Sequence, residues 1–352
     1  MSAPYLSVIV PAYNCPVTLE RVLGAIAASD LPRGEWELIV ADDGSTDSTP
    51  SVAARMADAV VRVANGPRGP GRARNEGASS AAGEVLVFVD ADVCVSRTAL
   101  SQFAALFRAR PALGAVFGAY DATPEAPGLV SQYRNLLHHY VHSMSAGAAV
   151  TFWAGCGAVR RTAFVAANGF DAERYRRPQI EDIELGYRLS AMGWPIVLVP
   201  EITGTHLKRW TFTGGVITDF RDRGVPWMQL ILERKEVAAA GPLNLARREK
   251  VFTVIAPLGV AAAVAAVVFR SWLPGAIALV VFASIMAGNA RLLAWFARVR
   301  GVGFAVMVMP LRLAYYTLNA VSAGWAVLGH LRHSDSTDAP RGDRFQPSRA
   351  SS

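Results

Sequence analysis

Short apolar runs alternate with amphipathic stretches along the first 200 residues of the chain. Residues 6–10 and 85–89 are apolar throughout, as in strands that are buried on both faces of a sheet, and residues 37–41 and 59–63 form two further strands. Residues 18–28 repeat apolar side chains at the helical period. This alternation predicts an α/β domain with a mostly parallel sheet that is covered by helices.

The pattern is less regular between residues 112 and 210. It predicts strands near 114–119, 152–159 and 195–199, and helices near 129–145, 161–167 and 181–192. Residues 211–250 form an amphipathic linker, which either lies along a membrane surface or packs on the preceding domain. The first domain is therefore predicted to cover residues 1–210.

Three long apolar segments follow the linker. Residues 251–269 and 272–290 each contain 19 residues without a charge, close to the ~20 residues that a helix needs to cross a bilayer. Residues 302–331 are also long enough, but they contain Pro310 and Arg312. Arg312 is either paired within the protein, close to the membrane interface, or a sign that the segment is bent. Two or three C-terminal transmembrane helices are thus expected.

The apolar part of the chain carries six of the seven units of the net charge of +7. Residues 1–250 carry 26 basic and 25 acidic side chains, whereas residues 251–334 carry six arginines and neither lysine nor acid. Loops that face the cytoplasm collect Arg and Lys, so the surplus fits a multi-pass protein of the cell (inner) membrane and gives no reason to expect a nucleic-acid partner. We place the membrane region at residues 251–331 and a disordered tail at 332–352.

The N-terminal domain is expected to be cytoplasmic. The chain starts with an apolar strand and no signal-like segment, and its three cysteines (Cys15, Cys94 and Cys156) form no CxxC pair, which fits a reduced compartment. The positive-inside rule is satisfied if the basic residues before 251 and after 290 lie inside and the turn at 270–271 lies outside. A third full crossing would then leave the tail outside.

Acidic pairs follow two of the predicted strands. Asp42-Asp43 comes after residues 37–41, and Asp90-Ala91-Asp92 comes after residues 85–89. Open α/β sheets bind ligands at the carboxyl ends of their strands. The oxygens of Asp90 and Asp92 suit a hard divalent cation, Mg²⁺ or Mn²⁺, that would also neutralise a diphosphate.

Four motifs in this order resemble those of the family 2 glycosyltransferases of membrane-anchored bacterial type. They are Val8-Ile9-Val10-Pro11-Ala12-Tyr13-Asn14, Asp42-Asp43-Gly44-Ser45, Gly71-Arg72-Ala73-Arg74-Asn75-Glu76-Gly77 and Asp90-Ala91-Asp92. The resemblance covers about residues 5–210. It implies the GT-A fold, a Rossmann-like nucleotide-diphospho-sugar transferase domain, and a nucleotide-sugar donor.

The resemblance also implies a set of nucleotide-binding residues, namely Pro11, Tyr13, Asp42, Asp43, Arg74 and Asp90. The ring of Tyr13 would stack on the base, while Asp43 would accept from the base or from a hydroxyl. Asp42 has an alternative role, because an Asp at this position can cap the turn. Arg74 follows a glycine-rich loop and opens a helix, so it can meet a base or a phosphate.

Glu181-Asp182 at the start of the helix near 181–192 matches the family's catalytic acidic pair, in which the Asp is the general base. Its carboxylate would take the proton from an acceptor hydroxyl as that oxygen attacks the anomeric carbon opposite the diphosphate, which inverts the configuration. Two acids in the first turn of a helix are also ordinary partners of the helix dipole.

The segment His206-Leu207-Lys208-Arg209-Trp210 overlays the family's Gln-x-x-Arg-Trp with His in place of Gln. His206 would join Asp90 and Asp92 as a metal ligand or touch the diphosphate. Arg209 would offset the diphosphate charge, and Trp210 would bound the acceptor pocket. The alternative is a basic strip beside the membrane.

These features together predict a metal-dependent, hexosyltransferase-like inverting glycosyltransferase of cell-envelope glycan or glycolipid biosynthesis. The sugar would pass from a nucleotide-sugar donor to a hydroxyl or phosphate of a lipid-linked or glycan acceptor, because membrane anchoring raises the effective concentration of such an acceptor. Two alternatives stay open: a processive polysaccharide synthase, for which two or three spans are few, and a non-catalytic sugar-nucleotide-binding membrane protein, which the full set of acids disfavours.

Overall fold

The computed structural model describes residues 3–234 and 247–333, which form two compact units. The described part of the first unit consists of residues 3–126 and 141–208, and that of the second consists of residues 127–140, 209–234 and 247–333. One boundary between the units lies between residues 208 and 209. The sequence did not predict that residues 127–140 belong to the second unit. The predicted tail lies almost entirely outside the described residues.

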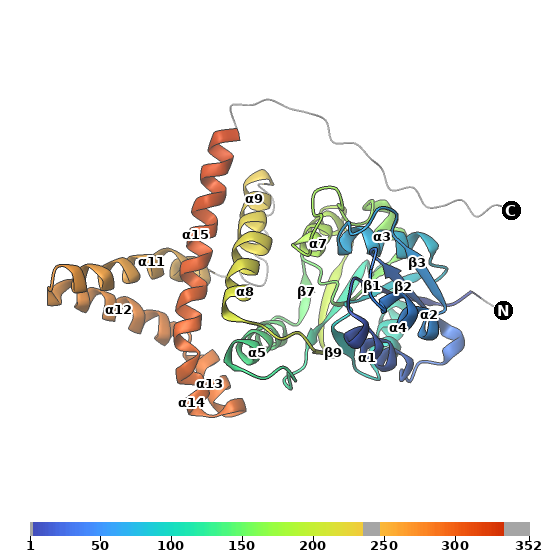
Figure 1. The fold of residues 1–352 in the computed structure, drawn as a ribbon, viewed down its shortest axis with the longest axis horizontal. Helices are drawn as coiled ribbons and strands as arrows, with labels where there is room; N and C mark the ends of the chain where they lie inside the picture. The colour runs from blue at the N-terminus through green and yellow to red at the C-terminus, as the bar shows by residue number, and fades with distance from the viewer. Residues whose placement is uncertain (1–2, 235–246, 334–352) are drawn as a thin grey trace. The chain divides into compact units, whose positions relative to one another are not determined.

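One mixed sheet forms the centre of the first unit (Figure 1). Its strands are β1 (Leu6–Ala12), β2 (Trp36–Asp42), β3 (Ala59–Arg62), β4 (Val85–Val89), β5 (Val93–Val95), β6 (Ala115–Tyr120), β7 (Gly147–Ala149), β8 (Cys156–Arg160) and β9 (Ile196–His206). Their spatial order is β3-β2-β1-β4-β8-β6-β9-β5, with β7 also paired to β9. β1 to β4 are parallel, whereas β8, β5 and β7 run antiparallel to their neighbours. β6 and β9 pair in parallel and run in the direction of β1 to β4, so six of the nine strands share one direction, as the prediction of a mostly parallel sheet requires.

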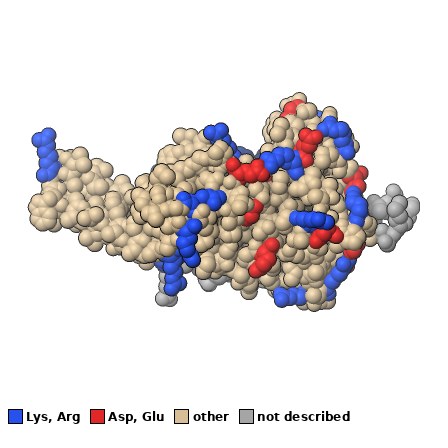
Figure 2. Space-filling model, turned by 90° about the horizontal axis from the view of Figure 1, so that it is seen from below, with Lys and Arg blue, Asp and Glu red and all other residues tan. Residues whose placement is uncertain are grey.

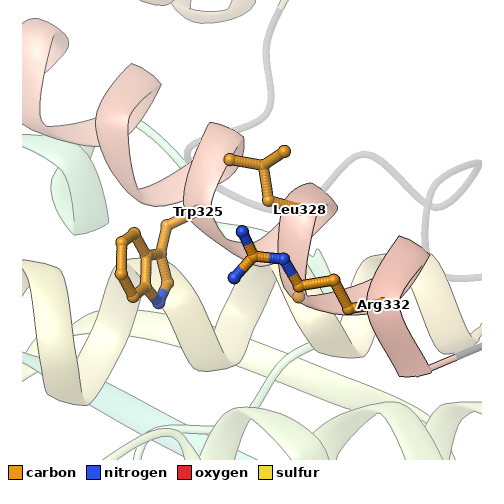
Figure 3. A pocket seen from close by; sticks show the side chains of 4 residues that line it. Trp325, Leu328 and Arg332 are labelled. Carbon is orange, nitrogen blue, oxygen red and sulfur yellow. The ribbon is translucent and has the colours of Figure 1, made fainter.

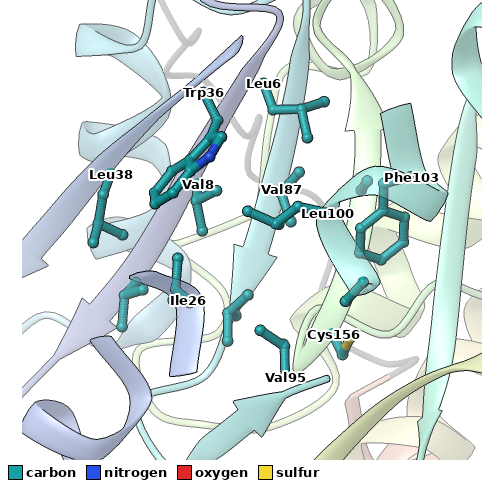
Figure 4. Packing of buried hydrophobic residues seen from close by; sticks show 14 of the residues in the cluster. Leu6, Val8, Ile26, Trp36, Leu38, Val87, Val95, Leu100, Phe103 and Cys156 are labelled. Atoms are coloured by element: carbon teal, nitrogen blue, oxygen red, sulfur yellow. The ribbon is translucent and has the colours of Figure 1, made fainter. Parts of the chain in front are cut away.

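Helices cover both faces of this sheet. They are α1 (Pro16–Ala27), α2 (Thr49–Met56), α3 (Pro70–Ser80), α4 (Ala99–Ala109), α6 (Arg161–Ala166) and α7 (Glu181–Ala191), with a short 3-10 turn η1 (Arg33–Glu35). On one face, strand residues such as Val8 and Val87 pack against Ile26 of α1 and against Leu100 and Phe103 of α4 (Figure 4). Every residue of β1 is buried, as the continuous apolar run predicts for a strand inside a doubly covered sheet.

The loops after β1, β2 and β4 meet at one edge of the sheet. The chain leaves β1 toward β2 on one side, and β4 pairs with β1 on the other, so this edge is a topological switch point of the kind that binds ligands. Close backbone packing requires glycine here: a Cβ added at Gly66 would lie 2.5 Å from the carbonyl oxygen of Asp43, and Gly44 has φ +82°.

The second unit is helical. It contains residues 127–140, most of them in α5 (Leu129–Ser143), followed by α8 (Phe212–Ile217), the π-helical segment η2 (Thr218–Gly224), α9 (Val225–Glu233), α11 (Arg247–Val268), α12 (Trp272–Gly288), α13 (Ala290–Arg300), α14 (Val302–Met307) and α15 (Met309–His333). Two helical stretches, 248–268 and 302–332, are long and apolar enough to cross a membrane, and α12 with α13 is a third if this pair, bent by 66°, forms one span. The surface of α11 and α12 carries few charged side chains (Figure 2).

Arg312 is paired within the protein, which was one of the three possibilities for it. Its side chain is buried and donates to Glu249 Oε2 (2.8 Å) and to Asn289 Oδ1 (2.9 Å). Tyr316 also donates to Glu249 Oε2 (3.0 Å). This network joins the start of α11, the junction of α12 with α13, and α15.

Candidate active site

The loops after β1 and β2 hold each other through polar contacts. The backbone N–H of Asn14 donates to Ser45 Oγ (3.0 Å), and that of Thr46 donates to Asn14 Oδ1 (2.9 Å). Pro11 is buried in β1, whereas Tyr13 is 46% exposed. The ring of Tyr13 is thus open to a ligand at this edge, as its predicted role requires.

The two acids after β2 serve the backbone. Asp42 Oδ1 accepts from Ser45 N (3.1 Å), which is the turn-capping alternative. Asp43 accepts from Arg68 N (2.8 Å) and Gly69 N (2.7 Å), one with each carboxylate oxygen, so it positions the loop before α3, a role that the motif did not predict. Burial raises the pKa of Asp43, and the two backbone donors only partly offset this rise.

Arg74 contacts two carboxylates, and its predicted contact with the nucleotide stays a prediction. Its side chain is buried and donates to Asp90 Oδ1 (2.6 Å) and to Glu181 Oε1 (2.8 Å). Phe170 lies under the guanidinium at 5.3 Å from the ring centroid. Because each terminal nitrogen of its guanidinium bonds to a carboxylate, Arg74 connects α3 to the end of β4 and to the start of α7.

Glu181 and Asp182 begin α7 in different environments. Glu181 is buried and accepts from Arg74 and from Gln179 N (2.8 Å), so its carboxylate is held in place at the start of α7, and its predicted catalytic role stays a prediction. Asp182 accepts from Ala154 N (3.0 Å) and Ile183 N (2.8 Å). Burial, followed by the Glu181 carboxylate, raises the pKa of Asp182 to about 7. This is the value that suits a general base at neutral pH.

The acidic motifs converge at the end of β4. Asp90 N donates to the carbonyl oxygen of Gly155 (3.2 Å), while the neighbouring Ala154 N donates to Asp182. Arg74 bridges Asp90 to Glu181 on the other side. One polar cluster in the first unit is thus formed by residues from the end of β4, from α3, from the start of α7 and from the segment before β8.

The other half of the Asp90-Ala91-Asp92 motif lies beside β9. Asp92 Oδ2 is 3.4 Å from His206 Nε2, and the imidazole stacks on Tyr120 with 4.4 Å between the ring centroids. Burial alone would raise the pKa of Asp92, but His206 and then Lys208 hold it below its ordinary value. Asp92 is therefore ionised at neutral pH.

These side chains fit a divalent cation. Two ligands that each lie about 2.1 Å from one cation are about 3.0–3.4 Å apart, which matches the spacing of Asp92 and His206. The Asp90 and Asp92 side chains are each 32% exposed. Among residues 3–234 and 247–333, no three His, Cys, Asp or Glu side chains are arranged as a complete metal site. A Mg²⁺-like ion bound by two carboxylates plus substrate phosphates needs no such complete set.

Arg209 and Trp210 lie in the second unit, at the start of its second segment. Trp210 N donates to Ser131 Oγ (2.8 Å), and the guanidinium of Arg134 lies 4.1 Å from the centroid of the Trp210 ring. Arg134 also pairs with Asp219 (2.5 and 2.8 Å). The predicted acceptor role of Trp210 stays a prediction.

Two participants in the site were missed from the sequence. Tyr120 supports His206, and the backbone N–H of Ala154 orients Asp182. Neither lies in a motif. The only sequence signal for Tyr120 was its position just after the strand predicted near 114–119. The backbone N–H of Ala154 could not be predicted, because a backbone donor does not depend on the type of side chain.

Residues 7–166 match the family described as "Glycosyl transferase family 2". The chain therefore carries a family 2 glycosyltransferase domain with the GT-A fold, followed by long apolar helices. It is similar to validoxylamine A glucosyltransferase of Streptomyces hygroscopicus subsp. jinggangensis over 240 residues, with 29% identity. This match covers 57% of this chain and 55% of that protein. It is also similar over 94 residues (37% identity) to the GalNAc(5)-diNAcBac-PP-undecaprenol beta-1,3-glucosyltransferase of Campylobacter jejuni, covering 25% of this chain and 30% of that protein.

The chain thus spans about half or less of the length of these relatives. Among solved structures, the mannosyltransferase PcManGT of Pyrobaculum calidifontis, in complex with GDP-Man and Mn²⁺, superposes with a TM-score of 0.60 at 22% identity. The match covers 92% of this chain and 88% of that one. At this identity the likeness supports the shared fold.

Proposed function

We propose that this protein is an inverting, metal-dependent glycosyltransferase of the inner membrane. It transfers a sugar from a nucleotide-sugar donor to a lipid-linked acceptor, and its first unit faces the cytoplasm. The observation that supports this most is the Asp182 carboxylate, whose pKa is about 7 and which lies in one polar cluster with Asp90 through Glu181 and Arg74.

Asp182 supplies the base for transfer. Its two oxygens each accept one backbone N–H, and each keeps a second lone pair for the proton of an acceptor hydroxyl. As the acceptor oxygen bonds to the anomeric carbon, the bond from that carbon to the diphosphate oxygen breaks and the proton passes to Asp182. Attack opposite the leaving group inverts the configuration.

The cation would be held by Asp92 and His206. The Asp90 carboxylate oxygen that does not bond to Arg74, Oδ2, would be a further ligand. When bound, it neutralises the charge that develops on the departing diphosphate. The Mn²⁺ in the mannosyltransferase complex supports this assignment. Without a cation, the acids at the end of β4 would repel the donor.

Removal of divalent cations is expected to abolish transfer. Dialysis against EDTA should lower turnover by about 100-fold or more, because a cation contributes several kcal/mol to stabilisation of the leaving group. Addition of Mn²⁺ or Mg²⁺ should restore it, and Asp92→Asn should raise the cation concentration needed for half-maximal rate. Full turnover after exhaustive chelation would contradict the metal assignment.

The pH profile is expected to have a rising limb near pH 7. The base must be deprotonated, and burial raises the pKa of Asp182 to about 7, so turnover should increase about tenfold for each pH unit below that value and level off above it. The measurement is the initial rate at saturating donor and acceptor, taken at about six pH values between roughly 5.5 and 9. A flat profile across pH 6–8 would exclude a base with this pKa.

The acceptor class is tested on the full chain in lipid vesicles. A panel of nucleotide sugars is first screened for Mn²⁺-dependent thermal stabilisation, since a ligand that binds only the native state raises Tm. The best donor is then offered with polyprenyl-phosphate-linked and with soluble acceptors. Faster transfer to the lipid-linked acceptor is expected, in line with the undecaprenol-linked compound in the name of the Campylobacter relative. Equal rates would overturn the acceptor class, and long products would indicate a processive synthase.

A further inference from the structure

We infer that only α11 and α12 cross the membrane, and that α15 lies along its surface beside η2 and α9, so that the C-terminus is on the same side as the first unit. The inference rests on the proposed membrane anchoring and goes beyond it, because length and hydropathy alone make 302–332 a candidate span.

The base of the α11–α12 hairpin fixes the depth of the first half of α15. Residues 247–250 at the start of α11 are all charged, so this end lies at the membrane interface. Arg312 and Tyr316 of α15 both bond to Glu249 there. The apolar cluster shared by these helices consists of Phe252, Ala256, Ile285 and Tyr316, all of them in the first three turns of α11, the last turn of α12 or the first half of α15. α15 therefore meets the hairpin at its base.

The second half of α15 packs on a helix that cannot enter the hydrocarbon. α8, η2 and α9 form one continuous helical stretch from Phe212 to Glu233, and α15 runs along η2 and α9 (Figure 1). Ser322 approaches Gly224 so closely that an added Cβ would lie 2.6 Å from Ser322 Oγ, and the Trp325 ring lies 6.2 Å from that of Phe220.

Four of the seven residues of η2 are charged. Arg221 and Arg223 are exposed, and Asp222 pairs with Arg221 at 2.9 Å. Charged side chains at the centre of a bilayer are rare and costly, so η2 lies at the interface or on its aqueous side. Since α15 is packed beside η2, it lies at the same depth.

α15 itself has the features of a surface helix. Val321, Trp325 and Leu328 are exposed and recur at i, i+4 and i+7, so they form one apolar stripe along the helix. Trp325 and Leu328 line a shallow pocket with Arg332, whose charge lies beside them (Figure 3). Trp is enriched at membrane interfaces, and Arg there keeps its charge in the headgroup region. This stripe is fitted to the surface of a lipid bilayer.

The contrast with α11 supports the assignment. The most apolar stretch of α11 is more apolar than that of 302–332, and fewer of its residues are buried against the rest of the protein. α12 is shorter, with 17 residues, but it contains no charged side chain and ends at Asn289, where the chain turns by 66° into the arginine-bearing α13. The basic residues at the start of α11 and those of α13 then lie on the same side of the membrane.

Reporter fusions test the topology. Green fluorescent protein, which fluoresces in the cytoplasm, and alkaline phosphatase, which is active outside it, are each fused after Arg270 and after Ser352 in a bacterial host. We expect the two fusion points to lie on opposite sides, with fluorescence at Ser352 and phosphatase activity at Arg270. Both points on the same side would overturn the inference. Opposite sides with the signals exchanged would leave it intact and overturn the proposed cytoplasmic placement of the first unit.

A matched pair of lysine variants provides the second test. Val321→Lys/Leu328→Lys places two charges on the exposed stripe of α15, and Val254→Lys/Ala261→Lys places two at the same spacing on the exposed face of α11. The α15 variant should keep its membrane-bound fraction within about twofold of wild type, whereas the α11 variant should lose about fivefold or more. An equal loss for both variants would show that α15 is buried in the bilayer.

Discussion

Asp182→Asn is expected to lower sugar transfer by about 1,000-fold while leaving donor affinity within about twofold, because a general base contributes roughly 10²–10⁴-fold and the amide cannot accept the proton. Asn occupies the same volume and keeps one acceptor oxygen for a backbone N–H of Ala154 or Ile183. Release of nucleoside diphosphate in the presence of acceptor measures transfer, and calorimetric titration with the donor measures binding.

Two further variants make this result specific. Glu201→Gln removes one negative charge from an exposed position of β9 and should keep full activity. Asp182→Glu keeps a carboxylate but moves it by about one methylene, so it should retain an intermediate rate that still rises with pH. Near-normal turnover of Asp182→Asn would remove this residue from the mechanism. A parallel loss of donor affinity would instead assign it to binding.

Much of the fold could be predicted because its first half obeys local rules. Apolar runs bounded by turn residues matched β1, β2, β3 and β4 to within two residues at each end. The antiparallel strands were harder. β5 and β7 have three residues each, too few for a pattern, and β9 continues past Pro200 and Gly204 because it pairs with β5 and β6 beyond the predicted end near 199. Long-range pairing decided these elements.

The positions of the acidic residues of the site could be predicted from the sequence, whereas the residues that they contact could be predicted less well. Asp90, Asp92 and Asp182 lie where the motifs place them, at strand and helix ends of one region. For Arg74, a glycine-rich loop before a helix suggested an anion site, and the sequence did not indicate its two carboxylate partners, which are 16 and 107 residues away. Local spacing carries no information about such contacts.

Arg74→Ala is expected to be the most destabilising single change in the first unit. The Arg74 side chain is 5% exposed, and its removal leaves Asp90 and the buried Glu181 without their shared counter-charge. Breaking a buried ion pair in this way costs about 3–5 kcal/mol. Because 1 kcal/mol corresponds to about 2–4 °C for a unit of this size, Tm should fall by about 10 °C. Thermal unfolding of the detergent-solubilised chain provides the measurement.

Arg72→Ala is the matched control, because Arg72 lies two residues earlier in α3 and pairs with Glu76 (2.7 Å) at the surface, where side-chain exposures are 43% and 33%. Its loss should cost less than about 1 kcal/mol. The double variant Arg74→Ala/Glu181→Gln should recover part of the lost Tm, since it removes one of the two uncompensated carboxylates. If the double variant were less stable than Arg74→Ala alone, the destabilisation would come from lost packing against Phe170, and the charge network would not be what holds α3, β4 and α7 together at the site.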